Sequence, residues 1–232
     1  MVLPEMVCAH TKADDQRIVH STTLIFTTVG DTLKPAGTGV LIDSRRRWIV
    51  TTSSAVGAAT DVFVCFPMVK NGRVVTDLAS YTTQSDRLNI RGTVVATDRV
   101  RGLALIELSS LPKDVVAVRL ADRGPKPADK VCAVTHFIIS GSLWNVLSGV
   151  VRSVYQTKPA AGPGAERLTV AEATFPLLPL SDGPAFNNNG ELVGFFSQRV
   201  RNRLMYVFLD ISEIRSFLRT NGDRNAAAKT GS

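Results

Sequence analysis

Short apolar runs dominate the chain between Arg17 and Leu209, and clusters of Gly, Pro, Asn and Asp separate them. Many of these runs alternate apolar and polar positions or are rich in β-branched residues, as in "TTLIFTTV" and "DVFVCF". This pattern is typical of β-strands joined by tight turns. It predicts strands at 18–27, 37–43, 47–52, 61–67, 92–97, 102–108, 130–136, 146–154, 167–173, 191–197 and 204–209.

The strands follow one another without the alternating helices of a parallel sheet, which favours an all-β barrel or sandwich. A helix is predicted only in "DISEIRSFLRTN" (210–221), where Asp210 or Ser212 can cap the start and Ile214, Phe217 and Leu218 form one apolar stripe. The Pro-containing segment 111–129 is expected to connect two halves, and 158–167 is expected to be a surface loop. The last ten residues, 223–232, are expected to form a flexible tail or a linker.

The composition is that of a globular protein, with 44% hydrophobic and 20% charged residues in 232. No run approaches the roughly 20 apolar residues needed to cross a bilayer, so no membrane partner is expected. The N-terminus lacks a basic start followed by an apolar core, so no secretory signal is expected. Cys65 and Cys132 lie in apolar runs and the three cysteines show no patterned spacing. We therefore predict reduced thiols without disulfides, and a cytoplasmic location.

The formal net charge of +7 raises nucleic acid or an acidic partner as a ligand. Arg45, Arg46 and Arg47 lie between two predicted strands, which indicates a solvated hairpin tip. Arginines also alternate along "QRVRNRLMY" and would share one face of an extended chain; these are Arg199, Arg201 and Arg203. A charged outer face of a hairpin is the favoured interpretation, and without a nucleic-acid-binding motif such binding is unlikely on sequence grounds.

Four stretches, in order, form a larger pattern: "GTGVLIDSRRRWIVTTSSAV" (37–56), "VVATDRVRGLALIEL" (94–108), "KVCAVTHFIISGSLWNVLSGVVRSV" (130–154) and "LPLSDGPAFNNNGELVGF" (178–195). Together they resemble the histidine, aspartate, second-barrel and serine segments of the trypsin-like serine peptidases, especially the high-temperature-requirement type. The resemblance implies an all-β chymotrypsin-like fold of two perpendicular antiparallel β-barrels with a short C-terminal helix. It places the first barrel at 17–115 and the second barrel with the helix at 116–222.

The resemblance also implies which positions would carry catalysis. In the family, a histidine deprotonates the serine, an aspartate orients the histidine, and backbone N–H groups hold the oxyanion. The corresponding positions here are Ser54 for the histidine, Gly102 for the aspartate and Ser181 for the serine. Pro179 stands where the family has a glycine whose N–H is an oxyanion donor, and proline has no N–H. Asp182 adds a negative charge directly after the serine.

The remaining titratable residues offer no replacement catalytic set. His10 and His20 lie before or at the first predicted strand, and His136 is expected to be a loop or partly buried histidine rather than a base. Asp43 and Asp98 lie near hairpin turns, where they are expected to accept backbone hydrogen bonds. We interpret Ser181 as a residue inherited with the turn in which it lies, rather than as a reactive nucleophile. No metal constellation is seen, and no cofactor or metal is expected.

The leading hypothesis is therefore a pseudoprotease, a peptidase fold that serves as a protein-binding, scaffolding or regulatory module. The alternatives are a weak or unconventional serine hydrolase that uses Ser181, and binding of nucleic acid or an acidic partner through surface arginines. The expected partner is another protein or peptide, and the chain can belong to a larger protein or complex. In the family, substrate adds as a strand beside the segment that here is 194–198. The predicted binding residues are Phe195, Phe196, Ser197, Arg199, Arg201 and Arg203; alternatively, loop 137–145 covers this edge and the arginines face water.

Overall fold

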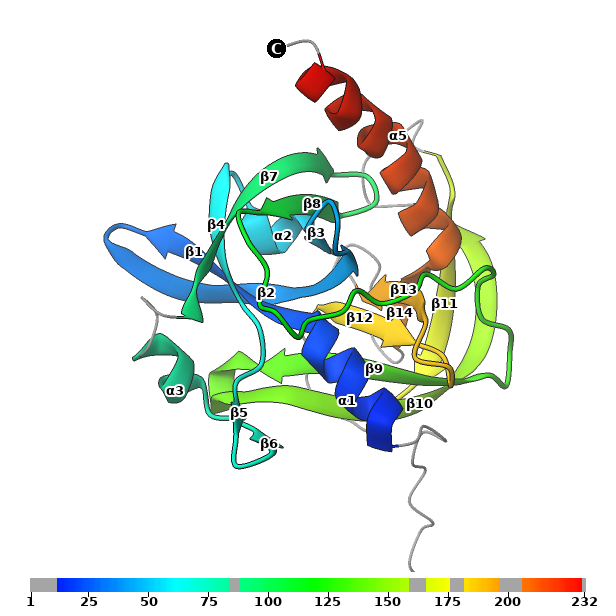
Figure 1. Cartoon of the computed structure of the whole chain (residues 1–232). Helices are drawn as coiled ribbons and strands as arrows, with labels where there is room; N and C mark the ends of the chain where they lie inside the picture. Colours follow the sequence, from blue (N-terminus) through cyan, green and yellow to red (C-terminus); the bar gives the residue numbers. More distant parts are fainter. Residues whose placement is uncertain (1–11, 84–87, 159–165, 176–181, 197–205, 231–232) are drawn as a thin grey trace, which may run out of the picture.

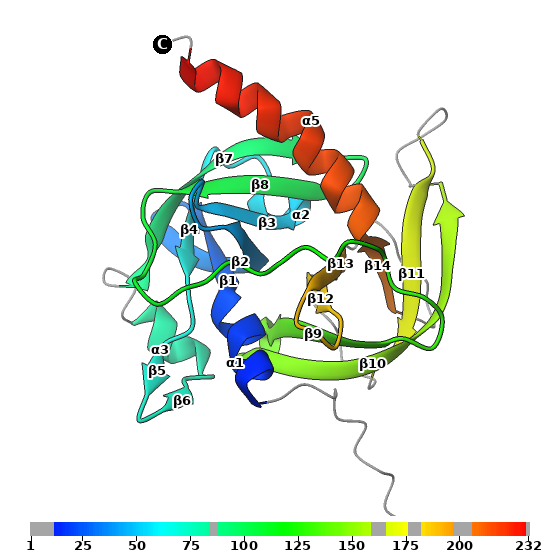
Figure 2. The ribbon, with the colours of Figure 1, turned by 45° about the vertical axis from the view of Figure 1, so that its right-hand side comes forward.

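The computed structural model describes residues 12–83, 88–158, 166–175, 182–196 and 206–230. Their strands form two closed antiparallel barrels, with the strand orders β1-β2-β3-β8-β7-β4 and β10-β11-β14-β13-β12-β9. Figures 1 and 2 show the barrels side by side, with helix α5 starting at the second barrel and running past the first. The predicted chymotrypsin-like fold class is confirmed.

The first barrel is built from six strands and a short helix that follows β3. Its elements are β1 (Thr22–Val29), β2 (Thr32–Asp43), β3 (Trp48–Thr52), α2 (Ser53–Val56), β4 (Asp61–Cys65), β7 (Ile90–Asp98) and β8 (Leu103–Leu108). An excursion between β4 and β7 holds a two-stranded sheet and one helix, none of which the apolar pattern predicted. These are β5 (Val69–Lys70), β6 (Arg73–Val74) and α3 (Leu78–Thr82).

The second barrel begins after a connection that contains no helix and only an isolated bridge between Leu120 and Leu192. Its elements are β9 (Lys130–Phe137), the 3-10 turn η1 (Ile138–Ser140), β10 (Ser142–Thr157), β11 (Leu168–Thr174), β12 (Gly183–Phe186), β13 (Leu192–Phe196) and β14 (Tyr206–Asp210). The sequence did not predict β12, a four-residue strand that contains Pro184. Gly183 is required there, because a Cβ would lie 2.5 Å from the Val134 carbonyl oxygen.

One buried cluster joins the two barrels, and each barrel also has a core of its own. The joining cluster contains Phe26 and Val50 from the first barrel together with Val134 and Phe195 from the second. Because side chains from both halves pack into one cluster, the barrels bury their contact as a core rather than as a wet interface.

Three expectations need correction. Residues 18–21 are not strand: helix α1 (Lys12–Ser21) occupies them, and the Ser21 and Thr22 hydroxyls donate to the Arg17 and Ile18 carbonyls of its last turn. Helix α5 (Ile211–Thr230) continues into the segment 223–232 that was expected to be a flexible tail. The run of three alanines at 226–228 explains this, since alanine has the highest helix propensity.

The third correction concerns the cysteines, because Cys132 is disulfide-bonded while Cys65 is free and buried. The prediction of a chain without disulfides is wrong for Cys132, since spacing along the sequence cannot reveal a pairing made by the fold. The prediction of a cytoplasmic location loses the argument from reduced thiols. Among the described residues, no helix combines the length and the apolar character needed to span a bilayer.

Candidate functional site

Ser54, which the resemblance assigns to the family's histidine position, lies on helix α2 directly after strand β3. The Thr52 side chain caps this helix by accepting from the Ala55 N–H at 3.3 Å, and Gly57 ends it with a φ of +57°. Gly37 allows the first hairpin to pass close by, since a Cβ there would lie 2.6 Å from the Ala55 Cβ. The glycine-start hairpin and the histidine segment of the sequence pattern are therefore in contact.

The Ser54 hydroxyl lies 2.9 Å from Oδ2 of Asp182, the residue that leads into β12 of the second barrel. The Thr52 hydroxyl donates to the same oxygen at 2.8 Å, and the Ser54 and Thr52 hydroxyls are 3.0 Å apart. A carboxylate of the second barrel is thus held by two hydroxyls of the first. We call this group of Thr52, Ser54 and Asp182 the hydroxyl–carboxylate contact.

Gly102, which the resemblance assigns to the family's aspartate position, is buried and directly precedes strand β8. Its carbonyl accepts from the Ser53 N–H at 2.8 Å, so the two positions are neighbours, as the resemblance implies. Its φ is +70°, a conformation that glycine adopts without strain. With no side chain at this position, no carboxylate is available to orient a base.

The turn before Gly102 carries a network of charges that the sequence did not reveal. Arg101, with 17% of its side chain exposed, pairs with Asp98 at 2.9 Å and with Glu213 of α5 at 3.0 Å. Glu213 also accepts from the Thr169 N–H of β11. The network therefore ties the β7–β8 turn of the first barrel to the second barrel and to α5. No signal in the sequence pairs residues 112 positions apart.

The turn interpretations of Asp43 and Asp98 are confirmed. Oδ1 of Asp43 accepts from the N–H groups of Arg45 and Arg46, at 2.8 and 2.9 Å. Oδ1 of Asp98 accepts in the same way from Val100 and Arg101, both at 2.9 Å. The arginines at 45–47 form the β2–β3 turn as predicted, and the Arg46 guanidinium lies 4.7 Å from the centre of the Trp48 ring.

His136 was expected to be a loop or partly buried histidine, but it lies on strand β9 and is fully buried, so it cannot reach a bound substrate as a base. Its Nδ1 accepts from the Trp144 N–H at 3.1 Å, which leaves the proton on Nε2 to reach the Thr23 carbonyl at 3.3 Å. Burial lowers its pKa to about 4, despite the hydrogen bond to the Thr23 carbonyl. The ring is neutral at pH 7, and both of its nitrogens are occupied.

The other predicted site residues fall into two groups. Phe195 and Phe196 on β13 are both buried, the first in the cluster that joins the barrels and the second against Phe175 and Phe208. Neither ring borders an open surface, and the backbone of 194–196 is paired on both sides, to β12 and to β14. The prediction that a peptide adds beside this segment is therefore wrong for 194–196, because no strand edge is free there. Pro179, Ser181, Ser197, Arg199, Arg201 and Arg203 lie outside the described residues.

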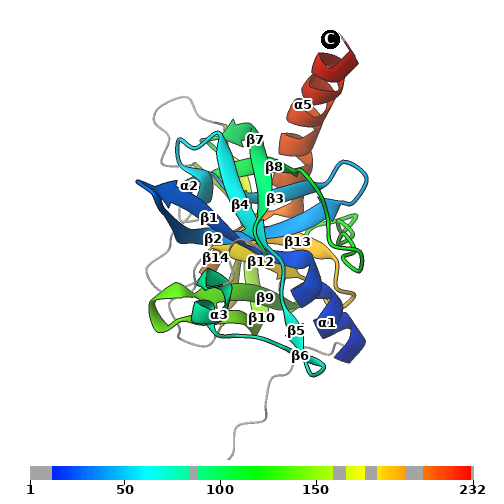
Figure 3. The ribbon, with the colours of Figure 1, turned by 60° about the vertical axis from the view of Figure 1, so that its left-hand side comes forward.

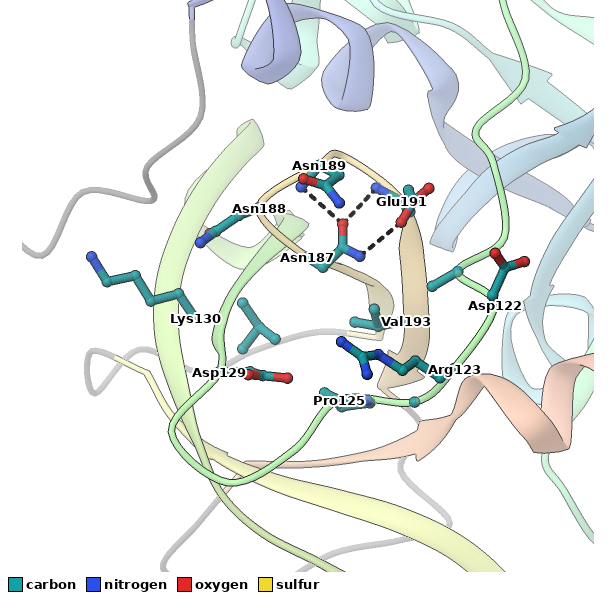
Figure 4. Close-up of a pocket in the computed structure, with 13 residues that line it drawn as sticks. Asp122, Arg123, Pro125, Asp129, Lys130, Asn187, Asn188, Asn189, Glu191 and Val193 are labelled. Carbon is teal, nitrogen blue, oxygen red and sulfur yellow. Dashed lines mark hydrogen bonds between the residues drawn. The ribbon is translucent and has the colours of Figure 1, made fainter.

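The described residues line a cavity beside Ser54 and another one elsewhere in the second barrel. One, of about 350 Å³, is lined by Ser53, Ser54, Gly57, Ala58, Thr97 and Arg99. The other, of about 360 Å³, lies at the far end of β12 between the connection 121–131 and the β12–β13 turn (Figure 4). There the Asn187 side chain donates to the Glu191 carboxylate and accepts from the Asn189 N–H. These polar groups of the wall are therefore hydrogen-bonded within the β12–β13 turn. Within the described ranges, no group of three or more His, Cys, Asp or Glu side chains is placed to hold a metal ion.

Comparison with solved structures finds the same architecture in Rv3671c from M. tuberculosis H37Rv. An inactive form of its serine-to-alanine mutant has a TM-score of 0.67 and 16% sequence identity, covering 96% of each chain. The inactive form of the Rv3671c protease has a TM-score of 0.66 and 17% identity, covering 90% of this chain and 93% of the other. At this identity the likeness concerns the fold. No curated protein matches the chain significantly.

The family comparison is more specific. A model of the trypsin-like peptidase domain matches residues 37–195, well over half of the chain. That range begins at Gly37 and ends at Phe195, so it includes all four stretches noted in the sequence. The chain therefore belongs to the trypsin-like peptidase domain family.

Proposed function

We propose that this chain is a trypsin-like domain without peptidase activity, a degenerate member of the high-temperature-requirement type that acts as a protein-binding, scaffolding or regulatory module. The observation that carries the proposal is the hydroxyl–carboxylate contact, in which Ser54 lies 2.9 Å from Asp182 at the histidine position. A serine hydroxyl cannot serve as a base near neutral pH, because it is far too weakly basic to take a proton from a second serine.

Two further features support the proposal independently. The aspartate position is Gly102, whose positive φ suits glycine and whose carbonyl is bonded to Ser53. The oxyanion position is Pro179 in the sequence, and the loss of one such donor costs about 3–4 kcal/mol of transition-state stabilisation. His136 offers no substitute, because it is buried, neutral and bonded at both nitrogens.

A fluorophosphonate probe tests the proposal, since such probes label only serines that a nearby base has activated. We expect the chain to remain unlabelled under conditions that label trypsin stoichiometrically, and to leave casein intact. Ser181→Ala serves as the matched control. Stoichiometric labelling that Ser181→Ala abolishes would contradict the proposal and establish the alternative, an unconventional serine hydrolase.

A binding function follows from what the fold retains. The barrels, their joining core and the turn hydrogen bonds are all present, while the positions that the resemblance assigns to the histidine, the aspartate and one oxyanion donor carry Ser54, Gly102 and Pro179. Binding of a peptide partner needs no catalytic side chain, so it is compatible with these replacements. Capture of a peptide partner by the intact domain, with no cleavage of that peptide, is the expected outcome of a binding assay followed by mass spectrometry.

A further inference from the structure

The cavity beside Ser54 has a chemical character of its own. It is lined by residues of the α2 segment on one side, Ser53, Ser54, Gly57 and Ala58, and by Thr97 and Arg99 of the β7–β8 hairpin on the other. Its volume of about 350 Å³ is enough for a single side chain or a small acid. Every residue that lines it belongs to the first barrel and to the described part of the chain.

The Ser54 hydroxyl is bonded to Asp182 and Thr52, but three other polar side chains of the lining have no hydrogen bond to the described residues. The Ser53 N–H is used by the Gly102 carbonyl, but the hydroxyls of Ser53 and Thr97 have no hydrogen bond among the described residues. The Arg99 guanidinium, in an exposed residue, likewise has neither an ion pair nor a hydrogen bond within those ranges. Three donor groups on partly or fully exposed residues therefore line one cavity, where a ligand can replace the water that solvates them.

The surrounding carboxylates leave the positive charge of Arg99 uncompensated. Asp98, its neighbour in sequence, is turned onto Arg101 and two backbone N–H groups. Asp182 lies on the other side of Ser54, where the hydroxyls of Ser54 and Thr52 hold it. Arg99 is thus the one charged residue that lines this cavity.

These features match the requirements of a carboxylate. The guanidinium of arginine presents parallel N–H donors that fit the two oxygens of a carboxylate, and hydroxyls can donate to the remaining lone pairs. We propose that this cavity binds a carboxylate of a polypeptide partner, with Arg99 as its main donor and Ser53 and Thr97 as supporting donors. The inference rests on the proposed binding function and adds to it the chemistry of the ligand.

The test uses the ¹⁵N-labelled intact chain and three short blocked peptides, followed by NMR titration. The first is acetyl-Gly-Glu-Gly-amide, the second carries Gln in place of Glu, and the third is acetyl-Gly-Gly-Gly with a free C-terminal carboxylate. We expect saturable shifts of the amides around 53–58 and 97–99 with a carboxylate peptide, and at least about tenfold weaker binding of the Gln peptide. Stronger binding of the first peptide would indicate a side-chain carboxylate as the ligand, and stronger binding of the third would indicate the carboxylate of a chain terminus.

Two charge-matched variants decide the role of Arg99. Arg99→Gln is expected to weaken carboxylate binding at least about tenfold, because it removes a charge-assisted hydrogen bond. Arg73→Gln removes the same charge from the β5–β6 hairpin, far from β7 (Figure 3), and is expected to leave the affinity unchanged. Retained cross-peaks in both spectra show that the variants are folded.

Three results would overturn the carboxylate site. They are equal binding of the Glu and Gln peptides, equal affinity of Arg99→Gln and the parent chain, and no saturable shift up to about 10 mM peptide. None of them bears on fluorophosphonate labelling of Ser181, which alone decides whether the domain is a peptidase. Labelling of Ser181, in turn, would overturn the proposed function without changing the affinities measured here.

Discussion

His136 and Ser54 both join the two barrels by hydrogen bonds. His136 does so in the core, and Ser54 does so at the solvent-exposed rim of the contact between the barrels. His136 reaches from β9 to the Thr23 carbonyl of β1, is fully buried, and packs edge-on against Trp144 with ring centres 4.4 Å apart. Ser54 reaches from α2 to Asp182 before β12 and is exposed to solvent. The chain thus places a histidine where no substrate can reach it, and a hydroxyl where the family has its base.

Under the proposed function, this difference explains how the fold can persist when catalytic residues are replaced. The buried contact must keep every polar group paired, because an unpaired buried donor or acceptor costs about 1–3 kcal/mol. The contact at the rim is open to water, so its residues can change at a small cost in stability. Loss of a catalytic histidine from such a rim therefore need not unfold the domain, whereas loss of His136 disrupts the core.

The largest effect is expected in catalysis, when catalytic side chains of the family are introduced at Ser54 and Gly102. Ser54→His with Gly102→Asp restores two catalytic side chains, but Pro179 still supplies no N–H to an oxyanion. A missing donor of this kind costs about 3–4 kcal/mol, a hundred- to a thousandfold in rate. The double variant is therefore expected to leave casein essentially uncleaved.

The triple variant that adds Pro179→Gly supplies the missing backbone donor and is the matched comparison. Casein cleavage by the double variant at rates approaching those of an active trypsin-like enzyme would contradict the assignment of Pro179. Cleavage that appears only in the triple variant would support it directly.

The buried contact is expected to make stability depend on pH. The pKa of His136 falls from its ordinary value of 6.5 to about 4 in the folded chain, because burial disfavours the charged ring. The unfolded chain then binds a proton near pH 6.5 while the folded chain does not, so stability decreases as the pH falls from about 6.5 to about 4. The full difference corresponds to about 3 kcal/mol. Urea unfolding across this range measures it.

His136→Gln is the control for this pH dependence. The glutamine amide offers an acceptor and a donor for Trp144 and Thr23 but does not titrate. The variant is expected to lose most of the slope between pH 6.5 and 4. A slope equal to that of the parent chain would show that other groups cause it, and that His136 is not the neutral buried ring described above.

The sequence predicted the barrels well because most of their strands carry an apolar face or are buried on both sides. It failed where tertiary contacts outweigh local pattern. Residues 18–21 read as strand because Ile18 and Val19 are apolar, yet they lie on a helix that buries them. Strand β12 was missed because Gly183 and Pro184 look like a turn, although Gly183 is fixed by close approach to Val134.

The candidate site, like the fold, was predictable where it depends on local sequence motifs and not where it depends on tertiary contacts. The positions of Ser54 and Gly102 were predicted from ordered motifs, and the structure brings their segments together through the Ser53–Gly102 hydrogen bond. The hydroxyl–carboxylate contact was not predicted, since it joins residues 128 positions apart. The sequence did mark Asp182 as unusual by its place after Ser181, and that oddity is the one signal that pointed toward the contact.

A smaller effect is expected from the charge network beneath the cleft. Arg101→Met keeps the length of the side chain but breaks its pairs with Asp98 and Glu213, whose side chains are 19% and 10% exposed. Removal of one partner from a largely buried pair leaves uncompensated charge, and we expect a loss of about 2–3 kcal/mol in the free energy of unfolding. Arg91→Met, which breaks a solvent-exposed pair with Asp61, should change stability far less. Equal effects of the two variants would show that the network does not tie the barrels together.

The smallest effect is expected at the rim itself. Asp182→Ala removes the carboxylate that Ser54 and Thr52 hold, but water can take its place because the contact is only partly buried. We expect a loss of about 1 kcal/mol in the free energy of unfolding, and a double-mutant cycle with Ser54→Ala isolates the part that belongs to the pair. A coupling near zero would mean that the two side chains meet without holding the barrels. A coupling as large as the His136 effect would mean that the contact between Ser54 and Asp182 stabilises the fold as much as the core contact does. The presence of Ser54 in place of a histidine would then have a structural cause.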